Sequence, residues 1–223
     1  MSRALARPIT YLITGGESSS TTGPESEEFR RLLALVRAAV DARVKLVQLR
    51  ENDLSGRLLF ELAAAAAHVA RGSETRILVN DRADIARAAG CDGVHLTTRS
   101  LDTAVVRRAF GEEFLIGVSA HTLQEARAAY AGGADFAVFG PVFDTPSKRA
   151  YGPPVGLEAL MTVALELSPF PLVALGGVGV EQVEDVLRAG AAGVAGIRLF
   201  ANGQNLARAV HLIEDLYALR RRA

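Results

Sequence analysis

Polar side chains that can bind anions or transfer protons follow short β-rich runs at several points in this sequence. An arginine follows residues 44–49, an Asn-Asp pair follows residues 76–79, and a histidine lies shortly after residues 114–118. Guanidinium groups bind phosphate oxygens, and carboxylates suit Mg²⁺. The pattern predicts a small-molecule site at the ends of these runs. The candidate substrate-binding residues are Gln48, Arg50, Asn80, Ser119, Thr145 and Lys148, and Asp81 is a candidate metal ligand.

His121 is the main candidate for proton transfer. It comes two residues after Ser119. An ordinary histidine titrates at about pH 6.5, so it can both take and give a proton at neutral pH. The alternative is that His121 caps a helix expected to begin near Thr122.

Glycines near the ends of the last two β-rich runs indicate a phosphate site. Two adjacent glycines follow residues 172–175, and another lies near the end of residues 193–199. Glycine lets backbone N–H groups approach an anion, and a helix N-terminus favours negative charge. The alternative is that these glycines only shape tight turns. The expected phosphate ligands are Gly176, Gly177, Gly196, Ile197 and Arg198.

Each of the other candidates also has a plain structural explanation. Arg50 could form a surface ion pair, and Asn80 and Asp81 could cap the next helix. His95 is expected to be a buried histidine with satisfied hydrogen bonds. If the strands form a barrel, the loops that follow them all open on one face. This shared location favours a functional role for these residues.

The elements that position these residues alternate between β-rich runs and Ala/Leu/Arg-rich amphipathic stretches, which is typical of βα units with a parallel sheet. Eight such strands close a (β/α)8 TIM barrel, and the chain length of 223 residues suffices for one. We therefore expect an α/β protein with one domain over residues 1–223. The expected strands are residues 9–13, 44–49, 76–79, 93–96, 114–118, 136–139, 172–175 and 193–199, and helices are expected over 25–42, after Ser55 and over 204–220.

Composition argues against several classes of partner, although a local basic patch stays possible. Lys+Arg and Asp+Glu both number 25, so no basic excess favours nucleic acid. No apolar run is long enough to span a bilayer, and residues 1–8 lack the apolar core of a secretory signal. We expect a cytoplasmic protein without nucleic-acid or membrane partners. Cys91 is expected to be a small buried residue, and a homodimer is expected from the frequency of two-fold symmetry alone.

The motifs at these strand ends resemble those of the thiamin phosphate synthase / thiazole tautomerase (TenI-like) family. The resemblance extends from about residue 11 to residue 200. It implies a TIM barrel and a small phosphorylated thiazole as substrate. The segments that carry it are VQLRE (47–51), VNDRAD (79–84), DGVHL (92–96), IGVSAH (116–121), FGPVFDTPSK (139–148), VALGGV (173–178) and GAAGVA (190–195).

The resemblance covers two activities. The synthase joins a pyrimidine methyl diphosphate to a thiazole phosphate with Mg²⁺ and releases pyrophosphate. The tautomerase shifts a proton on a carboxythiazole phosphate and needs no cofactor. For the synthase, the resemblance assigns Asp81 to Mg²⁺ and Arg50 and Lys148 to the diphosphate; for the tautomerase, it assigns His121 to the proton.

This chain departs from the synthase pattern at several positions. Asn52 stands where synthases carry a lysine, and Gly15 stands where they carry an aspartate. The run HLTTRS at 95–100 lacks the usual glutamine and aspartate, and Asp102 comes two residues too late to replace the latter. Fewer carboxylates weaken the binding of Mg²⁺. We therefore expect a thiazole tautomerase, an isomerase; the alternatives are a divergent thiamin phosphate synthase, a transferase, and a non-catalytic thiazole phosphate-binding protein.

Overall fold

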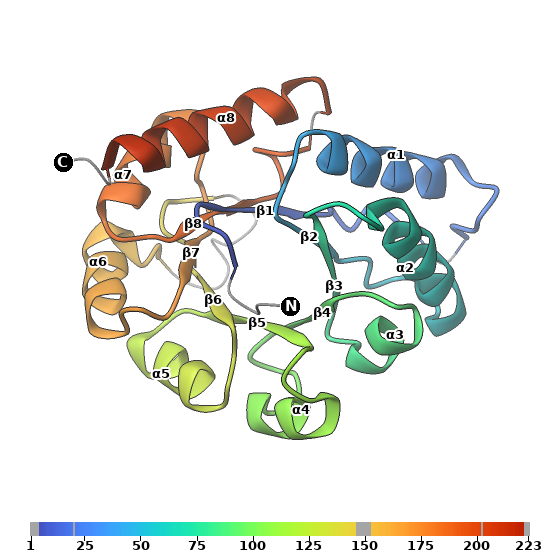
Figure 1. The fold of residues 1–223 in the computed structure, drawn as a ribbon, viewed down its shortest axis with the longest axis horizontal. Coiled ribbons are helices and arrows are strands. Elements are labelled where there is room, and N and C mark those ends of the chain that lie inside the picture. The colour runs from blue at the N-terminus through green and yellow to red at the C-terminus, as the bar shows by residue number, and fades with distance from the viewer. Residues whose placement is uncertain (1–4, 20, 146–152, 202, 221–223) are drawn as a thin grey trace.

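Eight parallel strands close into a barrel, and the helices form a ring around it (Figure 1). This computed structural model describes residues 5–19, 21–145, 153–201 and 203–220. Each strand pairs with the next in sequence, and β8 pairs with β1, so the sheet has no free edge. The predicted TIM barrel is confirmed.

The elements follow one another in strict alternation. The strands are β1 (Ile9–Ile13), β2 (Leu46–Leu49), β3 (Arg76–Asn80), β4 (Gly93–Leu96), β5 (Leu115–Ala120), β6 (Phe136–Phe139), β7 (Leu172–Ala174) and β8 (Gly193–Gly196). The helices are α1 (Glu27–Asp41), α2 (Gly56–Ala70), α3 (Ala83–Ala88), α4 (Thr103–Phe110), α5 (Leu123–Ala131), α6 (Gly156–Glu166), α7 (Val183–Arg188) and α8 (Gly203–Arg220), with the short 3₁₀ helix η2 (Val180–Gln182) before α7.

The expected strands are confirmed, with shifts at their ends. The last strand ends at Gly196 rather than at residue 199, because residues 197–200 form a turn in which the Phe200 N–H donates to the Ile197 carbonyl at 3.2 Å. The fifth strand extends to Ala120, so Ser119 lies within it. Ser55 caps α2 as predicted, and its hydroxyl accepts a hydrogen bond from the Leu58 N–H at 3.3 Å.

Two hydrophobic clusters make up the core. The larger lies between strands and helices, and the smaller fills the inside of the barrel. The rings of Tyr11 and Phe136 meet edge to face within the barrel, at 5.5 Å between centroids. Gly117 makes room for them, since a Cβ at this position would lie 2.4 Å from the Phe136 ring.

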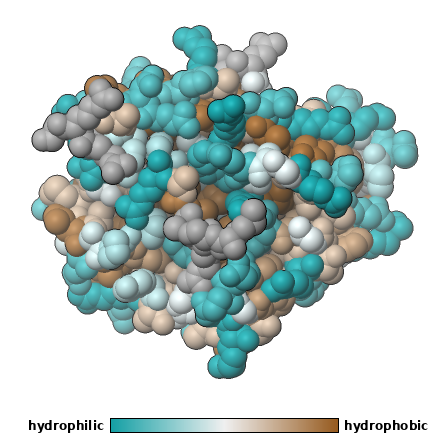
Figure 2. Space-filling model, in the orientation of Figure 1, coloured by the Kyte–Doolittle hydropathy of each residue, from teal (hydrophilic) through white to brown (hydrophobic). Residues whose placement is uncertain are grey.

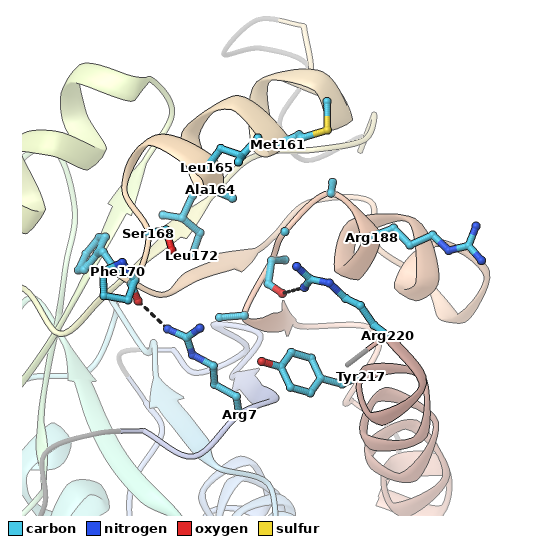
Figure 3. Close-up of a pocket in the computed structure, with 15 residues that line it drawn as sticks. Arg7, Met161, Ala164, Leu165, Ser168, Phe170, Leu172, Arg188, Tyr217 and Arg220 are labelled. Carbon is cyan, nitrogen blue, oxygen red and sulfur yellow. Dashed lines mark hydrogen bonds between the residues drawn. The ribbon is translucent and has the colours of Figure 1, made fainter. Parts of the chain in front are cut away.

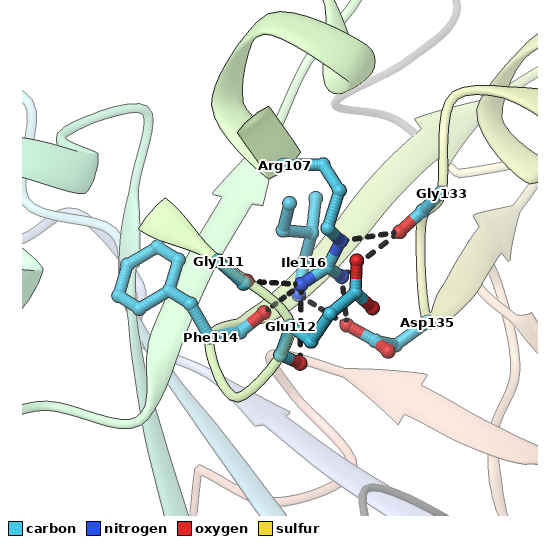
Figure 4. A network of polar contacts seen from close by, with 7 residues as sticks. All are labelled: Arg107, Gly111, Glu112, Phe114, Ile116, Gly133 and Asp135. Atoms are coloured by element: carbon cyan, nitrogen blue, oxygen red, sulfur yellow. Dashed lines mark hydrogen bonds and ion pairs between the residues drawn. The ribbon is translucent and has the colours of Figure 1, made fainter. Parts of the chain in front are cut away.

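A buried arginine ties together the N-terminal ends of two strands (Figure 4). Arg107, in the last turn of α4, donates to the carbonyls of Gly111, Phe114 and Gly133 and forms an ion pair with Asp135 at 2.8 Å. The Asp135 carboxylate also accepts from the Ile116 N–H at 2.7 Å. This network stabilises the end of the barrel opposite to the loops that carry the candidate site.

The surface is mainly hydrophilic, with smaller hydrophobic areas between the polar side chains on the face shown in Figure 2. Within the described part of the chain, every helix is too short or too polar to cross a membrane.

Candidate active site

The end of β2 carries two of the predicted residues to the mouth of the barrel. Gln48 is buried, and Arg50 is half-buried just beyond the strand. The Arg50 N–H donates to the Thr14 hydroxyl at 2.8 Å, which fixes the backbone of Arg50 against the end of β1. A Cβ added to Gly16 would lie 3.6 Å from the Arg50 guanidinium, so this side chain also lies against the β1 loop.

Glu51 holds the loop after β1 in place. Its carboxylate is buried and accepts from the backbone N–H groups of Gly16 at 3.3 Å and Ser18 at 3.1 Å. Backbone amides satisfy a buried carboxylate well, and the contact closes the rim between β1 and β2. Sequence reasoning gave Glu51 no role, although a charged residue directly after Arg50 was the available signal.

The amide of Asn80 bridges β2 and β3. Asn80 accepts from the Gln48 side chain at 2.8 Å and donates to the Asn52 side chain at 3.3 Å. Asn52 therefore takes part in an amide network at the mouth of the barrel.

Asp81 is exposed at the rim, directly after β3. Its backbone has a positive φ of 59°, and its N–H donates to the His95 carbonyl at 2.9 Å. Asn80 and Asp81 do not cap α3: its N-cap residue is Arg82, whose side chain makes no capping hydrogen bond. The carboxylate of Asp81 is available at the mouth of the barrel.

Inside the barrel, Tyr11 and His95 connect the first strand to the fifth. The Tyr11 hydroxyl lies 3.2 Å from Gln48 Oε1 and 3.1 Å from His95 Nδ1, and His95 Nε2 lies 2.9 Å from Ser119 Oγ. Burial lowers the pKa of His95 to about 3, so the imidazole is neutral. His95 is thus hydrogen-bonded as expected, and it contacts a predicted substrate-binding residue.

Sequence reasoning missed Tyr11. Its position as the third residue of β1 is typical of an apolar core residue, and only the closed barrel brings its hydroxyl to Gln48 and His95. The alternation of side chains along β1 could have indicated that it points inward.

His121 lies apart from this network. Its Nδ1 hydrogen-bonds to the Gly140 carbonyl, and its backbone N–H donates to Glu125 at 2.6 Å. The side chain lines a cavity of about 410 Å³ between α5 and α6, together with Phe139, Val155 and Glu158. The helix cap expected as its alternative role belongs to Thr122, whose hydroxyl accepts from Glu125 N–H.

The glycines after β7 have backbone conformations that favour glycine. Gly176 and Gly177 have φ values of 95° and 66°, which residues with a Cβ rarely adopt. A Cβ on Gly177 would lie 2.7 Å from that of Phe143 and 2.8 Å from the Asp144 carbonyl. The Phe143 N–H donates to the Gly176 carbonyl at 2.9 Å, so the loops after β6 and β7 pack together.

The loop after β8 lies beside the loops after β6 and β7. Gly196 is buried at the end of β8, and Ile197 and Arg198 are exposed. Arg198 donates to the Thr145 hydroxyl at 3.1 Å. The loops after β6, β7 and β8 therefore converge as predicted, while Lys148 lies outside the described residues.

A larger cavity, of about 560 Å³, lies at the opposite end of the barrel (Figure 3). It is lined by residues that precede β1, β7 and β8 and by the helices α6 and α8, including Arg7, Met161, Leu165, Tyr217 and Arg220. Arg7 and Arg220 each donate to a backbone carbonyl there. None of the predicted site residues within the described ranges lines this cavity.

Metal binding would depend on few protein ligands. The described residues contain no group of three or more His, Cys, Asp and Glu side chains that could hold a metal ion. Asp81, with Asn80 beside it, supplies one exposed carboxylate at the mouth. One or two carboxylates together with substrate phosphates are the usual ligands of Mg²⁺, so this donor set fits that ion.

Comparisons with known proteins identify the family. The family model described as thiamine monophosphate synthase matches residues 11–200. A thiamine-phosphate synthase of Anaeromyxobacter dehalogenans is 44% identical over 160 residues, which cover 72% of this chain and 71% of that protein. One of Moorella thermoacetica is 37% identical over 187 residues, covering 84% and 89%.

The fold agrees with these sequence matches. The solved structure of a thiamine phosphate pyrophosphorylase from Pyrococcus furiosus superimposes with a TM-score of 0.77 at 25% identity, covering 94% of this chain and 96% of that one.

The expectation of a thiazole tautomerase, and with it the isomerase class, is wrong. It depended on reading Asn52 and the run at 95–100 as loss of the diphosphate site, yet the relatives above carry the synthase name. In the structure, the Asn52 amide is bonded to Asn80, and Arg50 and Asp81 remain at the mouth. The proton-transfer role expected of His121 stays a prediction. By the match over residues 11–200 and the similarity to these relatives, the chain belongs to the thiamine monophosphate synthase family.

Proposed function

We propose that this protein is a thiamine-phosphate synthase, a transferase that joins a pyrimidine methyl diphosphate to a thiazole phosphate. The observation that carries the proposal is the 37% identity to a curated synthase over 84% of this chain and 89% of that protein, a span that includes most of the barrel. The arrangement of cationic, amide and glycine groups at the mouth supports it.

The substrates divide between two sides of the mouth. The thiazole phosphate would bind against Gly176, Gly177, Gly196 and Ile197, where Arg198 adds a positive charge beside Thr145. The diphosphate would bind across the mouth, near the Arg50 guanidinium.

The reaction needs little acid–base chemistry from the protein. The thiazole nitrogen forms a bond to the methylene carbon of the pyrimidine while the bond from that carbon to the diphosphate oxygen breaks. The pyrophosphate leaves with the electron pair, so negative charge grows on the leaving oxygen. Arg50 stabilises this charge, and a Mg²⁺ held by Asp81 and Asn80 would neutralise part of it when bound.

Turnover tests the proposal directly. The purified protein, supplied with both substrates and Mg²⁺, should form thiamin phosphate and pyrophosphate in equal amounts. Arg50→Ala should lower kcat/KM by about a hundredfold, because a charged contact to the diphosphate is worth about 2–5 kcal/mol where water is excluded. Arg57→Ala is the matched control, since Arg57 is exposed on α2 and paired with Glu61. Absence of product with the unmodified protein, or equal loss in both variants, would contradict the proposal.

A further inference from the structure

A continuous chain of side-chain hydrogen bonds crosses the inside of the barrel from β2 to β5. Its members come from five successive strands and the loop after β2. The bonds run Asn52–Asn80 (3.3 Å), Asn80–Gln48 (2.8 Å), Gln48–Tyr11 (3.2 Å), Tyr11–His95 (3.1 Å) and His95–Ser119 (2.9 Å).

The number of protons available determines which group donates in each of these side-chain hydrogen bonds. In the amide orientation that the structure shows, Gln48 Nε2 donates to Asn80 and Gln48 Oε1 faces Tyr11, so the single Tyr11 hydroxyl proton is donated to Oε1. The contact between Tyr11 and His95 then requires a proton on His95 Nδ1. A neutral imidazole carries only one proton, so Nε2 is an acceptor, and Ser119 must be its donor.

Packing prevents Tyr11 from leaving this arrangement. The side chain is fully buried, lies edge to face against Phe136 at 82°, and has its ring centroid 5.8 Å from that of His95. Burial raises the pKa of the Tyr11 phenol well above its ordinary value, so the hydroxyl keeps its proton. Tyr11 therefore stays in place as a protonated hydroxyl between Gln48 and His95.

We propose that Tyr11 is a positioning residue: it fixes His95 with its proton on Nδ1 and thereby turns the Ser119 hydroxyl proton inward, so that Ser119 offers only an acceptor to the barrel mouth. A hydrogen bond at Ser119 then selects an N–H donor of the substrate rather than a phosphate oxygen. Only the identity of that donor, on the pyrimidine ring, rests on the proposed synthase function.

The protonation of His95 can be measured without any substrate. Nitrogen-15 NMR of protein labelled at histidine distinguishes a proton on Nδ1 from one on Nε2, and loss of a signal in His95→Gln assigns the residue. We expect the proton on Nδ1 in the unmodified protein at neutral pH. Tyr11→Phe should move it toward Nε2, whereas Tyr130→Phe, an exposed tyrosine on α5, should not. A proton on Nε2 in the unmodified protein, or no change in folded Tyr11→Phe, overturns the proposal.

Kinetics provide the second measurement. Tyr11→Phe and Ser119→Ala should each raise KM for the pyrimidine diphosphate by about tenfold, the value of one hydrogen bond, and leave KM for the thiazole phosphate unchanged. The double variant should be no worse than Ser119→Ala, because both changes remove the same contact. If the effects of the two single changes on KM add up in the double variant, the proposal is overturned.

The two measurements keep the failures apart. A protein with the predicted His95 proton and no synthase turnover refutes the proposed function and leaves the role of Tyr11 intact. Normal synthase turnover with the proton on Nε2 of His95 refutes the role of Tyr11 and leaves the proposed function intact.

Discussion

Gly177 adopts a left-handed conformation against the loop that follows β6, and this makes it a sensitive test of the phosphate site. Gly177→Ala adds a methyl group 2.7 Å from the Phe143 Cβ. We expect KM for the thiazole phosphate to rise at least about tenfold. We expect the free energy of unfolding to fall by about 1–3 kcal/mol, because the added methyl group overpacks the loop and alanine disfavours a positive φ.

Gly72→Ala is the matched control for this change. Gly72 has a φ of 80° but open space where the Cβ would lie, so the substitution carries only the backbone strain. Its KM values should equal those of the unmodified protein. An equal rise in KM for both variants would show that the loop after β7 does not contact the phosphate.

His95 makes the stability of the protein sensitive to acid. Burial lowers its pKa from 6.5 to about 3. Between these values the unfolded chain binds a proton that the folded chain does not, so stability is complete above pH 6.5 and falls as the pH decreases toward 3. The protonation of His95 alone should lower the free energy of unfolding by about 2 kcal/mol between pH 6.5 and about pH 5.

Urea unfolding at these two pH values measures the effect. His95→Gln should lose less stability on acidification than the unmodified protein by that amount, whereas His211→Gln, exposed on α8, should behave like the unmodified protein. The same loss in His95→Gln as in the unmodified protein would assign the acid sensitivity to other groups.

Among the elements, α4 is held to the barrel by the Arg107 network. The Arg107 and Asp135 side chains are 10% and 5% exposed, so Arg107→Ala removes the ion pair from a buried carboxylate. Arg107→Ala should lower the free energy of unfolding by about 3–5 kcal/mol. Denaturant unfolding of Arg107→Ala beside Arg108→Ala, an exposed neighbour, measures this. A loss within about 0.5 kcal/mol of that of Arg108→Ala would contradict it.

For the whole molecule, the two ends of the barrel carry different tasks. The loops after the strands gather the substrate-binding candidates, whereas the opposite end holds the Arg107 network and the larger cavity (Figure 3). The expected homodimer stays a prediction, and light scattering coupled to gel filtration tests it. A particle of twice 23.6 kDa is expected, and a single species of 23.6 kDa at all concentrations would contradict it.

The alternation of β-rich and amphipathic runs was enough to predict the barrel, because each βα unit has its own local signal and eight is the number of strands that closes a barrel of this kind. The same signal predicted that the ends of the strands carry the polar candidates. Local periodicity did not predict where strands end: the turn at residues 197–200 is apolar enough to continue β8.

The sequence predicted individual candidate residues of the site but not the contacts between them. The sequence alone determined the barrel, the family motifs and the types of residue available at its mouth, because these follow from short-range pattern and composition. The tertiary structure decided which of them meet: it joined Arg198 to Thr145, separated His121 from the barrel interior, and brought the Tyr11 hydroxyl to His95. Such contacts link residues between 53 and 84 positions apart, and they depend on the closure and register of the sheet, which no local pattern encodes.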